Sequence, residues 1–204
     1  MTVPAELLER AAAWAAGEER VVLGIVGTPG AGKSTLAAGL VAALPGRAVL
    51  VPMDGFHLAD RELDRLGRRD RKGAPDTFDA AGYTALLQRV VDRVEDVVYA
   101  PVFMRERELA EAGALPVPRD VPLVVTEGSY LLMDGPFALV RELLTECWYV
   151  DVDPDLRRRR LVARHVRHGR TAEHARAWVD RTDEPNAVLI EATRDLADRV
   201  VRLS

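Results

Sequence analysis

Short runs of apolar residues alternate along the chain with longer segments in which apolar residues recur every three to four positions. The run at 21–26 leads directly into Gly27, which is typical of a strand buried in a parallel sheet. Such runs predict strands rather than helices because they are short and are bounded by glycine, proline or charged residues. We expect strands at residues 21–26, 48–52, 97–103, 123–126, 148–152 and 200–203.

The segments between these runs have the spacing of helices. In the first of them, Leu7, Ala11 and Trp14 fall on one helical face. Further along, Asp153 followed by Pro154 has the residue types of an N-cap and a first helical position. We expect a charged and mobile segment at 60–76, and helices at 4–16, 33–44, 83–94, 137–144, 154–166 and 187–196.

Strands that alternate with helices predict an α/β fold in which helices cover both faces of a parallel sheet. We expect a single domain over residues 1–204, because no repeat or linker divides the chain. Ligands of such sheets bind at the carboxyl ends of the strands. Four residues stand just past expected strand ends and are therefore candidates: Gly27, Asp54, Glu127 and Asp153.

The composition restricts the class of protein. Apolar residues make up 48% of the chain, charged residues 29%, and no apolar run approaches the ~18 residues of a membrane span. Residues 1–19 lack the basic start and apolar stretch of a secretory signal. Cys147 is the single cysteine, so an intrachain disulfide and a cysteine metal site are not expected. We therefore expect a cytoplasmic protein.

The charge argues against a nucleic-acid binder, because the net value is −4. Neither nucleic acid nor a membrane is expected as a partner, and a homodimer remains open. Lys33 and Lys72 are the only lysines among the 28 basic residues. We attribute the excess of arginine to codon usage, which weakens any argument from the presence of an arginine and makes Lys33 conspicuous.

The strongest chemical signal is a phosphate-binding loop. Its glycines let successive backbone N–H groups point at phosphate oxygens, and the helix that follows presents its positive end to the same anion. Lys33 can then reach the β- and γ-phosphates, and the hydroxyl of Ser34 can ligate Mg²⁺. The alternative is a glycine-rich turn that matches by chance, but a strand precedes the motif and a helix follows it. The pattern G-x-x-x-x-G-K-[ST] is matched by Gly27-Thr28-Pro29-Gly30-Ala31-Gly32-Lys33-Ser34, with Thr35 next.

A phosphate loop also occurs in GTPases and in ATP-driven motors or switch proteins. GTPases carry a guanine-reading Asn-Lys-x-Asp segment, and neither Lys33 nor Lys72 lies in one. Motors end a strand in Asp-Glu, whereas this chain has Thr126-Glu127-Gly128. These differences favour an ATP-dependent small-molecule kinase, with a regulatory P-loop protein as the alternative.

Two carboxylates have positions that suit phosphoryl transfer. Asp54 is the candidate general base, because a substrate hydroxyl must lose a proton as it attacks the γ-phosphoryl group. Its alternative is a turn-forming aspartate before Gly55. Glu127 is the candidate Mg²⁺ ligand together with Ser34, and its alternative is an exposed glutamate at a strand end. Asp153 is interpreted first as a helix cap.

These features together resemble the superfamily of uridine kinase, phosphoribulokinase and bacterial pantothenate kinase. The resemblance implies a nucleoside-kinase-like sheet, ATP with Mg²⁺, transfer to a primary hydroxyl, Asp54 as the base and Glu127 near the metal. It makes Lys33 the third catalytic candidate. The segments that carry the resemblance, in the order of the family, are the phosphate loop, 53–57, 71–79, 100–103, 126–128 and the arginine-rich stretch after 153.

Two differences within this resemblance concern the acceptor. The segment Lys72-Gly73-Ala74-Pro75-Asp76 is similar to pantothenate kinases, whereas uridine kinases have an acidic residue at the place of Gly73. Uridine kinases also have a histidine shortly after the position of Phe103, and 104–108 contains none. We expect a sugar or pantothenate-like acceptor, with a nucleoside kinase as the alternative. Its candidate ligands are His57, Lys72, Asp76, Phe103, Arg105 and Tyr130.

The expected helix after Asp153 carries a stripe of arginines. At ~100° per residue, Arg157, Arg160, Arg164 and Arg167 fall within an arc of about 80°. A neighbouring arc of Leu156, Ala163 and Val166 is expected to face the core. By resemblance the segment 154–175 is a mobile lid in which Arg160, Arg164 and Arg170 bind ATP phosphates. The alternative is a solvated face. The histidines at 165, 168 and 174 are expected at the lid surface.

Overall fold

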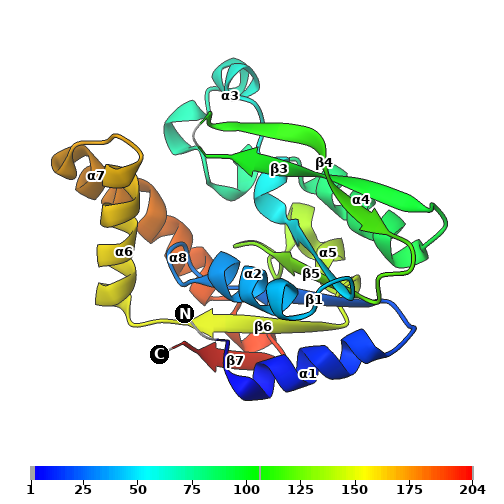
Figure 1. The fold of residues 1–204 in the computed structure, drawn as a ribbon. Helices are drawn as coiled ribbons and strands as arrows, with labels where there is room; N and C mark the ends of the chain where they lie inside the picture. Colours follow the sequence, from blue (N-terminus) through cyan, green and yellow to red (C-terminus); the bar gives the residue numbers. More distant parts are fainter. Residues whose placement is uncertain (1–2, 106, 204) are drawn as a thin grey trace.

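A computed structural model describes residues 3–105 and 107–203. Its central sheet is parallel throughout, and within the described residues its strands have the order β2–β5–β1–β6–β7 (Figure 1). Every residue of β1 is buried, as expected of a strand covered on both faces. The predicted parallel α/β sheet is confirmed. Its strands are β1 (Val21–Val26), β2 (Ala48–Pro52), β5 (Leu123–Glu127), β6 (Glu146–Asp151) and β7 (Arg199–Arg202).

Helices cover both faces of this sheet. On one face α1 (Ala5–Ala16) and α2 (Lys33–Ala43) pack Leu7, Leu36 and Leu40 against the sheet. On the other face Leu87, Phe137 and Ile190 belong to the second apolar cluster. The helical elements of this second face are α4 (Ala80–Asp92), the 3₁₀ turn η4 (Gly135–Phe137), α5 (Ala138–Glu142) and α8 (Glu184–Glu191).

An antiparallel hairpin of β3 (Val97–Met104) and β4 (Leu109–Pro118) lies apart from the central sheet (Figure 1). The sequence predicted β3 but not β4. Most of β4 is exposed, so its residues lack the alternation of apolar and polar side chains that marks a half-buried strand. Its conformation comes from pairing with β3, and the register shifts beside Pro101, which has no N–H to donate.

The segment 60–76, expected to be mobile, contains regular structure. It forms α3 (Asp60–Leu66) and the 3₁₀ turns η2 (Arg69–Arg71) and η3 (Pro75–Thr77). Ion pairs connect these pieces, and Arg69 contacts Asp60 at 3.0 Å and Asp64 at 2.8 Å. The charges that suggested a solvated loop therefore neutralise one another. Two further 3₁₀ turns are η1 (Met53–Phe56) and η6 (Arg194–Leu196).

The arginine-rich helix α6 (Pro154–Arg167) begins as predicted, because Asp153 accepts a hydrogen bond from the N–H of Leu156. Its buried face differs from the prediction. Leu161 and Arg157 are buried, whereas Val166 is 43% exposed and Ala163 is exposed as well. Arg157 forms an ion pair of 2.6 Å with Glu184, which offsets part of the cost of burying its charge.

After α6 the chain forms α7 (Ala172–Trp178), which the sequence did not predict, and the π-helical turn η5 (Val179–Asp183) before α8. In Figure 1, α6 and α7 lie on one side of the molecule, next to the carboxyl end of β6. The described part of the chain contains no helix with the length and apolar character to cross a membrane.

Candidate active site

The loop between β1 and α2 has the conformation of a phosphate cradle. Gly30 has a φ of +83°, in the left-handed region, and a Cβ at this position would lie 2.9 Å from Cγ of Leu161 on α6. The loop therefore needs glycine here both for its backbone and for its contact with α6. Its N–H groups stand at the N-terminus of α2, where an anion is favoured.

Lys33 is the first residue of α2 and its side chain turns back over the loop. Its Nζ donates to the carbonyl oxygens of Gly27 at 2.8 Å and Thr28 at 3.2 Å. Burial lowers the pKa of Lys33, and the charges of Glu127 and Asp54 act against that shift. The ammonium thus lies between the phosphate loop and the two carboxylates of the site.

Glu127 ends β5 and accepts a hydrogen bond of 2.9 Å from the hydroxyl of Ser34. Only 5% of Glu127 is exposed, so it is not the solvent-facing glutamate considered as the alternative. Burial, with the nearby charge of Asp54, raises the pKa of Glu127. A hydroxyl beside a carboxylate offers the hard oxygen ligands that Mg²⁺ prefers. These two residues fit such an ion.

Asp54 lies in η1, directly after β2. Its Oδ2 is 2.6 Å from Nη2 of Arg105, and its backbone carbonyl is 2.8 Å from Nδ1 of His57. Burial acts to raise the pKa of Asp54, but electrostatic interactions with His57, Arg105 and Lys33 outweigh it and hold the pKa below its usual value. The carboxylate is therefore ionised at neutral pH.

The residue after Asp54 explains why this turn is fixed. A Cβ on Gly55 would lie 2.4 Å from the carbonyl oxygen of Pro101, so η1 is pressed against β3. Gly55 therefore serves a close backbone approach in addition to its place in this turn.

One cavity of about 600 Å³ collects these groups at the carboxyl ends of β1, β2 and β5. Gly27, Thr28 and Ala31 shape the loop without lining the cavity. Most of the candidates from the sequence do line it: Pro29, Gly30, Gly32, Lys33, Ser34, Thr35, Asp54, His57, Lys72, Arg105, Glu127, Tyr130, Arg160 and Arg164.

Besides the three loop residues, three further candidates lie outside this cavity. Asp76 pairs with Arg71 at 2.8 Å and its side chain is 43% exposed. Phe103 packs on the ring of His57, with 4.5 Å between centroids. Arg170 stacks on Trp178, away from the phosphate loop.

His165 was expected at the surface of the lid, but the structure places it in a partly buried position. Its Nε2 is 2.9 Å from Oδ2 of Asp183, and its side chain is only 15% exposed. It is thus packed between α6 and η5 and is not a surface residue, because the unpredicted turn η5 covers it.

The cavity lining also includes polar residues that the sequence did not indicate, among them Asp183 in η5 and Asn186 in α8. Both are buried. They share a helical face with the buried residues Val179 and Ile190, so a polar side chain within an apolar stripe was the available signal.

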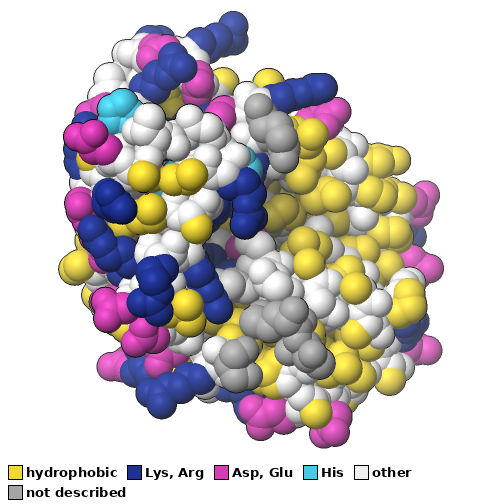
Figure 2. All heavy atoms as spheres, turned by 60° about the vertical axis from the view of Figure 1, so that its left-hand side comes forward, with side chains coloured by type: hydrophobic (Ala, Val, Ile, Leu, Met, Phe, Trp, Pro, Cys, Tyr) yellow, Lys and Arg dark blue, Asp and Glu magenta, His cyan; other side chains and the backbone are white. Residues whose placement is uncertain are grey.

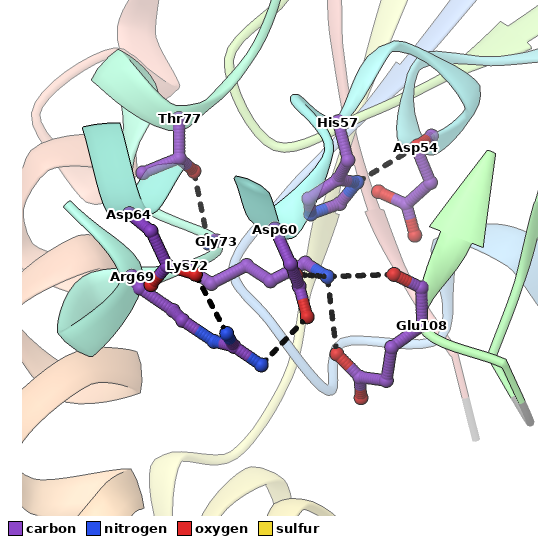
Figure 3. A network of polar contacts seen from close by, with 9 residues as sticks. All are labelled: Asp54, His57, Asp60, Asp64, Arg69, Lys72, Gly73, Thr77 and Glu108. Atoms are coloured by element: carbon purple, nitrogen blue, oxygen red, sulfur yellow. Dashed lines mark hydrogen bonds and ion pairs between the residues drawn. The ribbon is translucent and has the colours of Figure 1, made fainter. Parts of the chain in front are cut away.

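The side of the cavity at which the sequence predicts an acceptor is held by the loop around Lys72 (Figure 3). Nζ of Lys72 donates to Oδ1 of Asp60 at 2.7 Å and to the carbonyl oxygen of Glu108 at 2.8 Å. The carbonyl oxygen of Gly73 accepts hydrogen bonds from the hydroxyl of Tyr130 and from Nδ2 of Asn186. The loop, the segment after β5 and α8 therefore meet at one oxygen atom.

Comparisons with known proteins agree with this architecture. The model of the phosphoribulokinase/uridine kinase family matches residues 22–203. An uncharacterised Escherichia coli protein, YggC, is 34% identical over 92% of this chain and 79% of its own length. A Schizosaccharomyces pombe protein named "Putative uridine kinase" is 31% identical over 97% of this chain and 89% of its own.

A solved structure is similar over almost the whole chain. The "putative fructose transport system kinase" from Silicibacter sp. is 34% identical, with a TM-score of 0.85 over 96% of this chain and 97% of its own.

Proposed function

Because the chain belongs to the phosphoribulokinase/uridine kinase family, we propose that it is an ATP- and Mg²⁺-dependent kinase that phosphorylates a hydroxyl of a small acceptor. The observation that carries this proposal is the meeting of Lys33, Asp54 and the Ser34–Glu127 pair in one cavity beside the phosphate loop. A cation, an ionised carboxylate and a divalent-metal site are the groups that phosphoryl transfer requires.

The phosphate loop would hold the β- and γ-phosphates of ATP through its backbone N–H groups. Lys33 would exchange its hydrogen bonds to the loop carbonyls for the phosphate oxygens, while Arg160 and Arg164 approach them from α6. Mg²⁺ would neutralise charge on the β- and γ-phosphates. Ser34 and Glu127 would hold that ion.

Asp54 would accept the proton of the acceptor hydroxyl. A pKa held below the usual value makes it a weak base, but the transition state of phosphoryl transfer is loose and the hydroxyl loses its proton late. Orientation then matters more than basicity. The ion pair with Arg105 fixes the carboxylate for this task.

We favour a sugar or pantothenate-like acceptor over a nucleoside. The ring of His57 lies 4.0 Å from that of Phe78 and 4.5 Å from that of Phe103, measured between centroids, so contacts within the protein already engage this ring. The remaining acceptor candidates in the cavity wall, Lys72, Arg105 and Tyr130, each carry a polar group. The similar structure described as a fructose transport system kinase supports a sugar.

The test is an ATP-consumption screen with purified protein, Mg²⁺ and single acceptors: fructose, other hexoses, pantothenate and uridine. We expect ADP release that depends on one polyol acceptor and that disappears in Lys33→Ala, which controls for contaminating kinases. If uridine gives clearly the highest kcat/KM, the protein is a nucleoside kinase. If ATP is hydrolysed equally without any acceptor, a P-loop protein with a regulatory role is the better interpretation.

A further inference from the structure

A second cavity of about 420 Å³ adjoins the first on its acceptor side. The two cavities share His57, Lys72, Gly73, Arg105, Arg164 and Asp183 in their walls. The second continues between the loop around Lys72 and the α6–α7 region, where Arg170 and Trp178 line it. It contains none of the phosphate-loop residues. A group on the acceptor, rather than on the nucleotide, would reach it.

This second cavity carries an excess of positive charge. Its described lining includes five basic side chains, Arg69, Lys72, Arg105, Arg164 and Arg170, against three carboxylates, those of Asp60, Glu108 and Asp183. Figure 2, in which the α6–α7 side is turned forward, shows Lys and Arg side chains gathered around a hollow.

The three carboxylates are already engaged. Asp60 pairs with both Lys72 and Arg69, and Glu108 pairs with Lys72 (Figure 3). Asp183 contacts His165. Arg105 is matched by Asp54 in the first cavity. Arg164 and Arg170 are left without a carboxylate within 4 Å in the described part of the chain.

Arg170 is held in place without being neutralised. Its guanidinium carbon lies 3.8 Å from the ring centroid of Trp178. Stacking occupies a face of the guanidinium plane and leaves the N–H donors at its edges available for two parallel hydrogen bonds to an oxyanion. Across the described residues, its side chain has no hydrogen bond or ion pair.

We propose that the second cavity binds an oxyanion carried by the acceptor, with Arg170 as its anchor. The acceptor is then a sugar acid or a sugar phosphate rather than a neutral sugar. The proposal rests on the proposed kinase function and names the class of its acceptor. It also gives Arg170 a different ligand from the ATP phosphates expected by resemblance. A polyol anchored here can present its hydroxyl to Asp54, because Arg105 lines both cavities and contacts that carboxylate.

The test measures oxyanion binding without needing the natural acceptor. Protein is first saturated with a non-hydrolysable ATP analogue and Mg²⁺, so that the phosphate loop is filled. It is then titrated calorimetrically at constant ionic strength with glucose, gluconate, glucose 6-phosphate and inorganic phosphate. The variants are Arg170→Gln, Arg170→Lys and, as a matched control, Arg176→Gln, since Arg176 is exposed on α7 and lines neither cavity.

We expect at least one oxyanion to bind while glucose does not. Arg170→Gln should weaken that binding at least about tenfold, as expected for loss of charge-assisted hydrogen bonds, and Arg170→Lys should weaken it less. Arg176→Gln should have no effect, and analogue affinity should stay within about twofold in all variants. Gluconate alone would indicate a sugar acid, whereas the phosphate probes alone would indicate a sugar phosphate.

Three results would overturn the inference. One is that no oxyanion binds the loaded protein, and another is that Arg170→Gln binds it as well as the original chain. The third is that Arg170→Gln lowers the affinity for the ATP analogue instead. That result would indicate that Arg170 binds the ATP phosphates. If the original chain fails to bind the analogue at all, the kinase proposal itself fails, and this outcome is separate from the other three.

Discussion

The carboxylate of Asp54 and the guanidinium of Arg105 lie 2.6 Å apart and connect η1 with the turn that follows β3. Because both side chains line the first cavity, the pair belongs to the site and not to the scaffold alone. It orients the carboxylate and stabilises its ionised form. The first two predictions depend on this relationship.

Replacing Asp54 with asparagine should lower kcat by roughly 10²–10⁴, the usual contribution of a general base. ATP affinity should remain within a few-fold, because the hydrogen bond of the Asp54 carboxylate is to Arg105 and not to the phosphate loop. The measurements are steady-state kinetics and calorimetric binding of an ATP analogue. Collapse of nucleotide binding would mean instead that Asp54 is a metal ligand and that the base lies elsewhere.

Removing the charge of Arg105 should shift the pH dependence of catalysis. Arg105 lowers the pKa of Asp54, so Arg105→Ala raises that pKa, and protonation then removes the active carboxylate at a higher pH. The acidic limb of the kcat/KM profile should therefore move to higher pH. Arg107→Ala is the control, because this neighbouring arginine is exposed and lines neither cavity. Superimposable profiles for both variants would contradict a link between Arg105 and Asp54.

Lys33→Ala should abolish turnover and leave the fold intact. The side chain is buried, but its hydrogen bonds are to the carbonyl oxygens of its own loop and not to another element. Far-ultraviolet circular dichroism should therefore match that of the original chain, while phosphoryl transfer becomes undetectable. A near-normal kcat would refute the assignment of the phosphate loop.

The lid, proposed to cover residues 154–175, should become protected when nucleotide binds. Ion pairs from Arg157 to Glu184 and from Arg158 to Asp180 anchor the start of α6, so trypsin is expected to cut near Arg167 and Arg170. Adding a non-hydrolysable ATP analogue with Mg²⁺ should slow this cleavage, as followed by mass spectrometry. Cleavage at an unchanged rate would favour a solvated face with no role in closure.

The sequence predicted the first cavity better than its surroundings. Lys33, Asp54 and Glu127 could be brought together because parallel strands place their carboxyl ends at one edge of a sheet. The strands themselves were visible since runs such as β1 are buried on both faces and hence uniformly apolar. Local pattern and tertiary structure agree in this part of the chain.

Elsewhere the determining contacts are distant in sequence. β4 is defined by its partner strand, not by its own alternation. The buried face of α6 includes Arg157, which helical periodicity alone assigns to solvent or to phosphate, because its partner Glu184 lies 27 residues further along. Asp183 lines the cavity because it lies in the π-helical turn η5, which the sequence pattern does not predict.

The contact between Gly30 and Leu161 has a consequence for variation in this chain. Any side chain at position 30 would clash with α6, since even a β-carbon would lie 2.9 Å from Cγ of Leu161 and 3.2 Å from the carbonyl oxygen of Arg157. The phosphate loop and α6 are therefore in direct contact at this point, and the position of each restricts the position of the other. Substitutions at Leu161 and at Gly30 should behave as a coupled pair: a smaller residue at 161 would relieve the clash with the loop, while the strain of the positive φ at position 30 would remain.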